Sequence, residues 1–159
     1  MKTLFLGMSL PKLIMRYFNV LLLLSFLFLI SSCKKCDTED TNRGEVLDGI
    51  VRYMGQPLPE PMIINGQIFP TELEVSFNNG FSYVPVDFSK YTVLALPTTA
   101  SCSSPYDRNV IVNNGPQTVN YVVTISECPT CEGSITINNF VVINKVSSEY
   151  TAIFDIVRE

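Results

Sequence analysis

The sequence predicts a mainly β protein: a single-domain antiparallel sheet, curled into a barrel or doubled into a sandwich, with at most one short helix. Three observations predict this fold class. Apolar and polar residues alternate along several segments that are rich in Val, Ile, Thr, Tyr and Phe, the composition of half-buried strands. Asn-Gly pairs separate some of these segments, as they do in tight hairpins. Segments with helical spacing of apolar residues are scarce.

The first half of the domain contains one predicted strand, residues 46–53, and one predicted hairpin. The hairpin turns at Asn78-Asn79-Gly80, because Asn and Gly tolerate the positive φ angles that tight turns require. The segment before it, Phe69–Phe77, fits two structures. Its apolar residues, spaced by four, suit a helix, whereas their alternation with Glu72 and Glu74 suits a strand. We favour the strand and keep the helix as the alternative.

The second half contains the clearest strand patterns. A second Asn-Asn-Gly turn, at residues 113–115, separates two of the segments. At Asn138-Asn139 the side to which the apolar residues point changes, which predicts either a bulge or a third turn. Consecutive hairpins with few crossovers imply antiparallel pairing. The predicted strands are Tyr91–Leu96, Asn109–Val112, Thr118–Ile125, Ser134–Val146 and Tyr150–Ile156.

An apolar run, Tyr17–Ile30, precedes the domain. It holds about fourteen residues, whereas a membrane-spanning helix needs roughly twenty, and Arg16 supplies the positive flank of a secretory signal. Ser31 and Ser32 stand directly before Cys33. This arrangement resembles the lipobox of bacterial lipoproteins, and the resemblance implies cleavage before Cys33 and a diacylglycerol on its sulfur. An uncleaved anchor helix is the alternative.

The lipobox divides the chain into three predicted parts. Residues 1–32 are the signal peptide, with Met15 as the favoured true start, residues 33–45 are a lipidated, acidic tether, and residues 46–159 are the β-rich domain. The lipid anchor makes the membrane the first predicted partner. By resemblance to lipoprotein sorting signals, Lys34 favours the outer membrane as the location of the mature protein, on its periplasmic face or on the cell surface.

The charge of the chain excludes one class of partner. All fifteen acidic residues but only eight of the eleven basic residues follow residue 32, so the mature part carries a net charge of −7. An acidic chain without basic clusters is unsuited to binding nucleic acid. The prediction is therefore no nucleic-acid partner.

Four cysteines remain after Cys33: Cys36, Cys102, Cys128 and Cys131. An even number of cysteines in an exported protein predicts two disulfides, whose connectivity stays open. Cys128-Pro-Thr-Cys131 also has the spacing of a redox centre or of half a zinc site. Acidic neighbours disfavour a thiolate, and a second closely spaced pair is missing, so structural disulfides are favoured. No metal and no cofactor are predicted.

Residues 86–95 read VDFSKYTVLA. This segment resembles the DFSKYT signature of small Bacteroidetes-type lipoproteins of unknown function. More remotely, the layout of residues 86–157 is similar to the C-terminal domain of protease-complex-stabilising (PrcB-like) proteins. The resemblance implies an envelope protein and no particular activity. Read from its residues alone, Asp87-Phe88-Ser89 predicts an Asx or capping turn that leads into a core strand.

Catalytic constellations are few. The chain has no histidine, which excludes Ser-His-Asp and Cys-His catalysis and histidine-based zinc sites. Glu72 and Glu74 would lie roughly 7 Å apart on one strand face, which overlaps the separation of glycosidase carboxylates. Any such pair on a solvated strand face has this separation, so no catalytic residue is predicted.

The predicted loop Thr98–Asn109 is the candidate contact region, and a plain connector is the alternative. It presents Tyr106, Asp107 and Arg108, residue types that suit a preorganised binding edge. The sequence thus predicts a lipid-anchored envelope protein that acts as a non-catalytic binding or accessory module for another protein. A carboxylate-based glycan hydrolase and a structural subunit of an envelope complex are the alternatives.

Overall fold

The computed structural model describes residues 39–66, 73–101, 104–128 and 133–159. These residues form ten strands, and no helix occurs among them. The strands are β1 (Thr41–Gly44), β2 (Ile50–Tyr53), β3 (Met62–Ile64), β4 (Leu73–Ser76), β5 (Val84–Pro85), β6 (Tyr91–Ser101), β7 (Tyr106–Asn113), β8 (Thr118–Ile125), β9 (Ser134–Asn144) and β10 (Thr151–Arg158).

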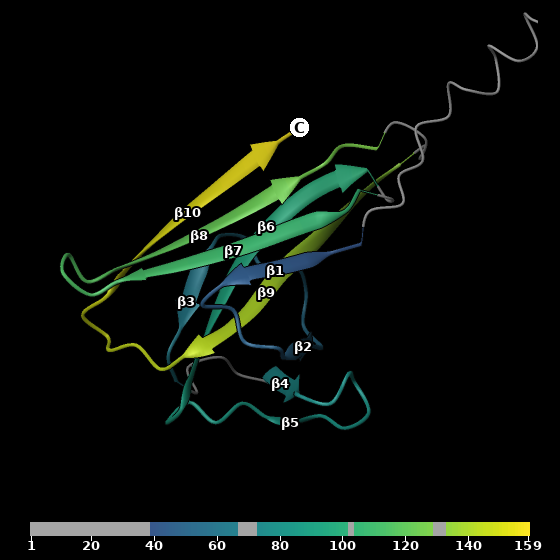
Figure 1. The fold of residues 1–159 in the computed structure, drawn as a ribbon. Coiled ribbons are helices and arrows are strands. Elements are labelled where there is room, and N and C mark those ends of the chain that lie inside the picture. Colours follow the sequence, from purple (N-terminus) through teal and green to yellow (C-terminus); the bar gives the residue numbers. More distant parts are fainter. Residues whose placement is uncertain (1–38, 67–72, 102–103, 129–132) are drawn as a thin grey trace, which may run out of the picture. The chain divides into compact units, whose positions relative to one another are not determined.

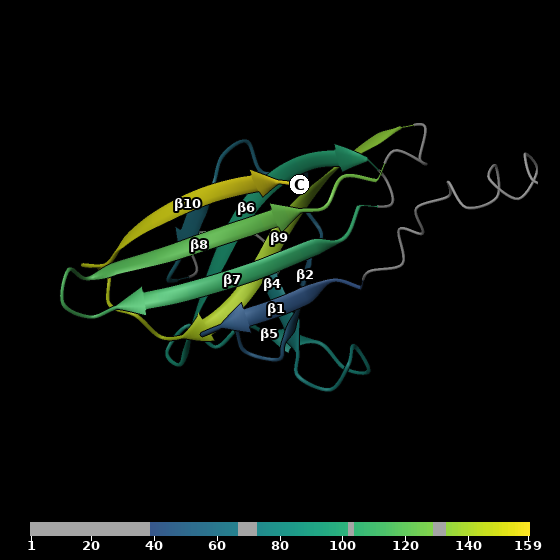
Figure 2. The same cartoon turned by 45° about the horizontal axis from the view of Figure 1, so that its top comes forward.

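The strands form three sheets (Figures 1 and 2). The four-stranded sheet has the order β1-β7-β8-β10, the middle sheet has the order β3-β6-β9, and the small sheet has the order β2-β4-β5. One buried cluster joins β7 and β8 to β6 and β9, and a second joins β6 and β9 to β3 and β4. The predicted mainly β, sandwich-like fold is confirmed, and the barrel alternative is wrong because the sheets do not close.

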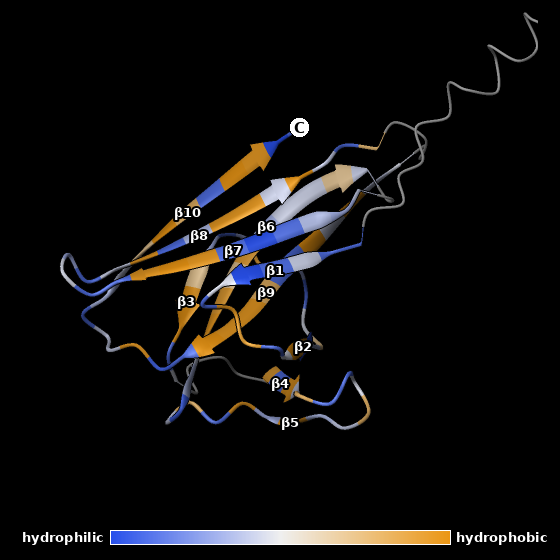
Figure 3. Ribbon diagram, viewed as in Figure 1, coloured by the Kyte–Doolittle hydropathy of each residue, from blue (hydrophilic) through white to orange (hydrophobic). Residues whose placement is uncertain are grey.

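The middle sheet is buried on both faces. Leu94 and Leu96 of β6 belong to the first cluster, whereas Val93 and Ala95 belong to the second. Strand β9 behaves in the same way, and Figure 3 shows its long apolar stretch. Strands that are covered on both sides read as continuous apolar runs, which explains why β6 and β9 alternate less clearly than β8.

Two of the strand pairs are parallel, which the sequence did not predict. Strand β1 runs parallel to β7, and β10 runs parallel to β8. The chain leaves β8, passes through β9 in the middle sheet and only then returns as β10, so it re-enters the four-stranded sheet in the original direction. Antiparallel pairing is confirmed for the other five pairs of strands.

The domain begins earlier than the predicted boundary at residue 46. Residues Thr41–Gly44, placed in the tether by the sequence, pair with Asp107–Val110 as strand β1. The chain then leaves the sheet, and the Glu45 N–H donates to the Val110 carbonyl at 2.9 Å. The segment is too short and too polar to show a strand pattern, so it is recognised as a strand only by its pairing with β7.

The predictions at the Asn-rich segments have different outcomes. The turn at residues 78–80 is confirmed, with Asn79 at φ 55° and Gly80 at φ 81°. Asn138-Asn139 is neither a turn nor a bulge, because β9 pairs with β6 residue for residue through this point. The apolar pattern changes there because Asn139 occupies a core-facing position. Of the ambiguous segment Phe69–Phe77, residues 73–76 form strand β4, as favoured, and residues 69–72 lie outside the described ranges.

Candidate binding surface

The three predicted contact residues lie in strand β7, not in a loop. Tyr106 is buried, and burial raises the pKa of its hydroxyl. Asp107 forms an ion pair with Arg43 and accepts a 2.5 Å hydrogen bond from the Thr41 hydroxyl. These contacts commit the side chains to holding β1 against β7. The expectation that Tyr106, Asp107 and Arg108 lie in a loop is therefore wrong, and their contact with a partner stays a prediction.

Arg108 leads into a buried polar network around Asn139, which is 1% exposed. The Arg108 Nε donates to Asn139 Oδ1 at 3.1 Å, and its Nη2 donates to Asp40 at 2.9 Å. Asn139 Nδ2 donates to the Leu96 carbonyl at 3.1 Å and to the Thr98 hydroxyl at 2.8 Å. Every polar atom of the Asn139 side chain is thus satisfied, as a buried polar group requires.

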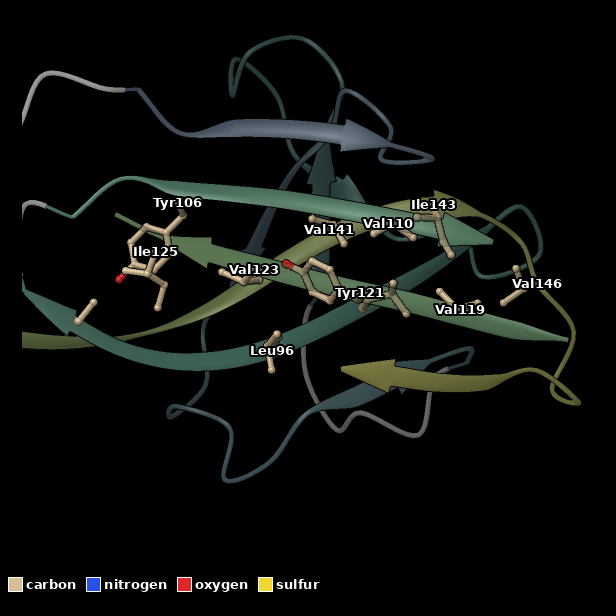
Figure 4. Packing of buried hydrophobic residues seen from close by; sticks show 12 residues of the cluster. Leu96, Tyr106, Val110, Val119, Tyr121, Val123, Ile125, Val141, Ile143 and Val146 are labelled. Carbon is tan, nitrogen blue, oxygen red and sulfur yellow. The ribbon is translucent and has the colours of Figure 1, made fainter. Parts of the chain in front are cut away.

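Tyr121 completes this network from β8. Its hydroxyl donates to the Asn139 carbonyl at 3.0 Å. Figure 4 shows the Tyr121 ring among aliphatic side chains, with Val119 and Val123 beside it on the same strand. Burial raises the pKa of Tyr121 well above its ordinary value. The network is a structural feature of the core around Asn139 and Tyr121, whereas the Asp40 side chain at its outer end is 53% exposed.

The predicted lipid and disulfide positions fall mostly outside the described residues, namely Cys33, Cys36, Cys102 and Cys131. Cys128 is 1% exposed and is disulfide-bonded. Its N–H donates to the Ser104 hydroxyl at 3.2 Å, and its carbonyl accepts from the Ser101 hydroxyl at 2.7 Å. The backbone around this cysteine is therefore fixed to the end of β6.

Of the acidic pair considered for glycan hydrolysis, the described residues include Glu74 alone. Glu72 lies outside the described ranges. The Glu74 carboxylate accepts a hydrogen bond from Arg52 Nε at 2.8 Å, and the Arg52 guanidinium lies 4.2 Å from the centre of the Tyr83 ring. Among the residues that the structure describes, no three Cys, Asp or Glu side chains gather as metal ligands.

The DFSKYT-like segment forms the turn that its residues predict. Asp87 Oδ1 accepts hydrogen bonds from the Ser89 N–H at 3.1 Å and from the Ser89 hydroxyl at 2.6 Å. These bonds, together with the nearby Lys90 ammonium, lower the pKa of Asp87. Strand β6 begins directly afterwards, at Tyr91. The segment is a capped entry to a core strand.

A different element presents apolar groups to solvent. We call residues 77–83, which connect β4 to β5, the hairpin tip. Phe81 is 89% exposed, and Phe77 before the turn is 46% exposed. A groove of about 250 Å³ adjoins Phe77. Its lining residues are Val75, Phe77, Asn78, Ser82 and Val84.

Hydrogen bonds fix the backbone of the hairpin tip. The Ser76 hydroxyl oxygen accepts from the Gly80 N–H at 3.0 Å. Asn78 Oδ1 accepts from the Ser82 N–H at 3.0 Å, and the Asn78 carbonyl accepts from the Phe81 N–H at 3.2 Å. The exposed aromatic ring is therefore carried on an ordered turn rather than on a loose loop.

The hairpin tip also carries no charge. No acidic or basic residue occurs between Val75 and Val86. The sequence predicted the turn but not the exposure of Phe81. An aromatic residue directly after an Asn-Gly pair could have indicated this exposure, because few other residues lie close enough to a turn to cover its side chains.

A larger groove, of about 460 Å³, lies where β9 leads to β10. Three of its polar side chains are already engaged: the Tyr150 hydroxyl donates to Asn114 Oδ1 at 2.7 Å, and Lys145 Nζ donates to the Asn65 carbonyl at 2.7 Å. A ligand in this groove would have to displace these contacts. The hairpin tip requires no such exchange, and it is the stronger candidate for a binding surface.

The chain matches no protein-family model, no curated protein and no solved structure. Within the described ranges, no helix has the length and apolar character needed to cross a bilayer.

Proposed function

We propose that this chain is a lipid-anchored protein of the bacterial envelope and acts as a non-catalytic binding module for another protein, which it contacts through the hairpin tip. One observation carries the binding role: Phe81 is 89% exposed on a turn whose backbone is fixed by hydrogen bonds.

The energetics of such a site favour binding. Burying a Phe side chain contributes roughly 1.5–3 kcal/mol, and large aromatic residues commonly dominate interface energies. A turn that is already ordered loses little conformational freedom on association. The adjoining apolar groove and the absence of charge between Val75 and Val86 suit an apolar contact on a protein partner.

The envelope location is supported by the residues before the domain. The short apolar run and Ser31-Ser32-Cys33 resemble a lipoprotein signal, which would place the protein in the outer membrane, at its periplasmic face or on the cell surface. The resemblance of residues 86–95 to small envelope lipoproteins is consistent with this location.

The two alternatives differ in their support. A structural subunit would use the same surface but keep its partner permanently, so it differs in the lifetime of the complex. The glycan hydrolase would need Glu74 as a free carboxylate, whereas Arg52 holds that group. We therefore do not propose catalysis.

Photo-crosslinking in intact cells tests the binding role. The photoreactive amino acid p-benzoylphenylalanine replaces Phe81, and the same probe replaces Ile111 as a control, because Ile111 is also exposed, at 49%, but lies in β7. We expect position 81, and not position 111, to capture one envelope protein.

The variant Phe81→Ser tests the same role by removing the exposed aromatic ring. Since Phe81 makes few internal contacts, we expect the free energy of unfolding of the variant to stay within about 0.5 kcal/mol of the wild type. Co-purification of the captured protein should nevertheless fall. The proposal fails if the same protein is captured from both positions, if Phe81→Ser still retains it, or if the probe at 81 forms adducts with lipid alone.

A further inference from the structure

The two edges of the four-stranded sheet differ in character. Strand β1 at one edge has four residues, Thr-Asn-Arg-Gly, all exposed and without an apolar side chain. Strand β10 at the other edge has eight residues, Thr-Ala-Ile-Phe-Asp-Ile-Val-Arg. Figure 3 shows β1 as largely hydrophilic and β10 as largely hydrophobic. Natural edge strands are usually short, charged, bulged or interrupted by proline. Strand β1 follows this rule, whereas β10 is long and largely apolar and carries charge only at Asp155 and Arg158.

The backbone of β10 offers a full row of pairing groups. The Thr151 N–H donates to the Gln117 carbonyl, and the Glu159 N–H donates to the Ile125 carbonyl, both at 3.0 Å. In a parallel ladder, alternate residues bond to the neighbouring strand, so the odd-numbered residues of β10 face β8. The N–H and C=O groups of the even-numbered residues point to the open edge. Within the described part of the chain, β10 pairs with β8 alone.

Both faces of this edge leave apolar surface exposed. Phe154 packs against Tyr121 on the core side, with ring centres 6.2 Å apart. Ile156 lies on that same side and is nevertheless 40% exposed. On the opposite face, Ile153 is 51% exposed and Val157 is 37% exposed. One added strand would cover apolar side chains on both faces and would extend the core at the same time.

We propose that the open edge of β10 pairs with β10 of a second copy of this chain, antiparallel about a twofold axis, so that the four-stranded sheet continues through the dimer. Isologous twofold contacts are the commonest in homo-oligomers. In such a contact, the unpaired backbone groups of an edge strand bond to the same groups of its copy. This inference is independent of the binding role of the hairpin tip.

The sequence of β10 selects one register. Two symmetric registers pair nearly the whole strand through its even-numbered residues. If the axis passes at Asp155, two carboxylates stand directly opposite each other, which is destabilising. If it passes at Phe154, Phe154 faces its own copy, Ala152 faces Ile156, and Asp155 faces Ile153. The second register opposes no like charges and pairs an aromatic residue with an aromatic residue, so we assign it.

One contact restrains this association. The Ile156 N–H, which points to the open edge, donates to Asp155 Oδ1 at 2.9 Å. In the dimer this N–H would donate instead to the Ala152 carbonyl of the second copy, so the Asp155 carboxylate competes with pairing. Removing that carboxylate is therefore expected to strengthen the dimer, an effect opposite to that of disturbing the apolar residues.

Sedimentation of the full-length, detergent-solubilised protein over a range of concentrations tests the proposal. We expect a monomer–dimer equilibrium whose dissociation constant rises about tenfold or more in Ile156→Lys and falls in Asp155→Ala. Ile111→Lys is the matched control, because Ile111 has similar exposure on a central strand and the variant keeps the same anchor. It should associate like the wild type, as should Phe81→Ser.

The register is tested by crosslinking between copies. With p-benzoylphenylalanine at position 153 and a mixture of ¹⁵N-labelled and unlabelled protein, we expect mixed-isotope adducts centred on residue 155 of the other copy. The proposal is overturned if the protein stays monomeric at all concentrations, if Ile111→Lys weakens association as much as Ile156→Lys, or if the adducts form away from β10.

Discussion

Gly44 ends β1 at a point where the chain leaves the sheet close to the backbone of Val110. Its φ is +69°, a conformation that side chains disfavour, and a Cβ at this position would lie 2.0 Å from the Val110 carbonyl oxygen. The Glu45 N–H donates a hydrogen bond to that same oxygen. The glycine is thus required by backbone conformation and by space together.

We expect Gly44→Ala to lower the free energy of unfolding by roughly 2–4 kcal/mol, because the backbone of β1 must shift to relieve the clash. Urea denaturation measures the loss. Gly115→Ala is the control, since nothing lies within 4 Å of its added Cβ and it should change stability by about 0.5 kcal/mol or less. Equal losses in the two variants would contradict this account.

Tyr121 gives the core a sensitivity to alkali. Burial raises its pKa, so the folded protein holds the hydroxyl neutral where the unfolded chain would ionise it. Its contribution to stability is therefore complete below about pH 10, the pKa of an unperturbed tyrosine, and is lost as the pH rises above that value.

The variant Tyr121→Phe removes the hydroxyl that donates to the Asn139 carbonyl. We expect a loss of about 1 kcal/mol at pH 7 and a smaller decline in stability between pH 9 and 11 than in the wild type. The remaining decline belongs in part to Tyr106, whose pKa burial also raises. Denaturant titrations at several pH values measure the slope, and an unchanged slope would refute the assignment.

At the scale of elements, side-chain charges add to the backbone pairing that holds β1 to β7. Partial burial raises the pKa of Asp107, but the hydrogen bond from Thr41 and the contact with Arg43 outweigh it, and the pKa lies below its ordinary value. Such a carboxylate stabilises the fold above the pKa of the unfolded chain, about 3.9, and this contribution disappears as the pH falls through the lower folded value.

We therefore expect β1 to loosen below about pH 4 before the rest of the four-stranded sheet. Hydrogen-exchange protection of the Glu45 amide, which bonds to Val110, reports this release. In Asp107→Asn the protection should be weaker at pH 7 and should change less on acidification. Simultaneous loss of protection in β1 and β8 would show that the strand has no separate acid step.

The strands that the sequence predicted best are those with one buried and one exposed face. Thr118–Ile125 alternates in burial along its whole length, and alternation is the pattern that sequence reasoning detects. Strand β1 escaped because its four residues are all polar and its partner lies more than sixty residues away. Asn139 was misread because its partners come from β6 and β7, which local sequence does not reveal.

The candidate surface was only half predictable for the same reason. The Asn79-Gly80 pair has a local cause, positive φ, and was predicted from two residues. The exposure of Phe81 depends on what the rest of the chain leaves uncovered, and that is a tertiary property. The start of β7 shows the converse: its residue types suggested contacts with a partner, but Asp107 and Arg108 form hydrogen bonds with residues of β1 and β9.

At the scale of the whole molecule, our proposal assigns different tasks to the described residues and to the lipoprotein signal proposed for residues 1–32. The sandwich buries two apolar clusters with its own strands, so its folding does not depend on a membrane. In the proposed lipoprotein, membrane attachment would come entirely from a lipid on Cys33. One acyl chain gives only marginal membrane binding, at about 0.8 kcal/mol per buried CH₂, whereas several chains make attachment effectively permanent.

We therefore expect Cys33→Ala to abolish incorporation of radiolabelled palmitate and to release the protein from sedimented envelopes without changing its unfolding midpoint. Cys36→Ala is the matched control, because it removes a thiol three residues further along and leaves Ser31-Ser32-Cys33 intact; it should keep the label and the attachment. If Cys33→Ala still carries palmitate and still sediments with membranes, another residue or an uncleaved apolar segment holds the protein there, and the assignment of residues 1–32 as a lipoprotein signal is wrong.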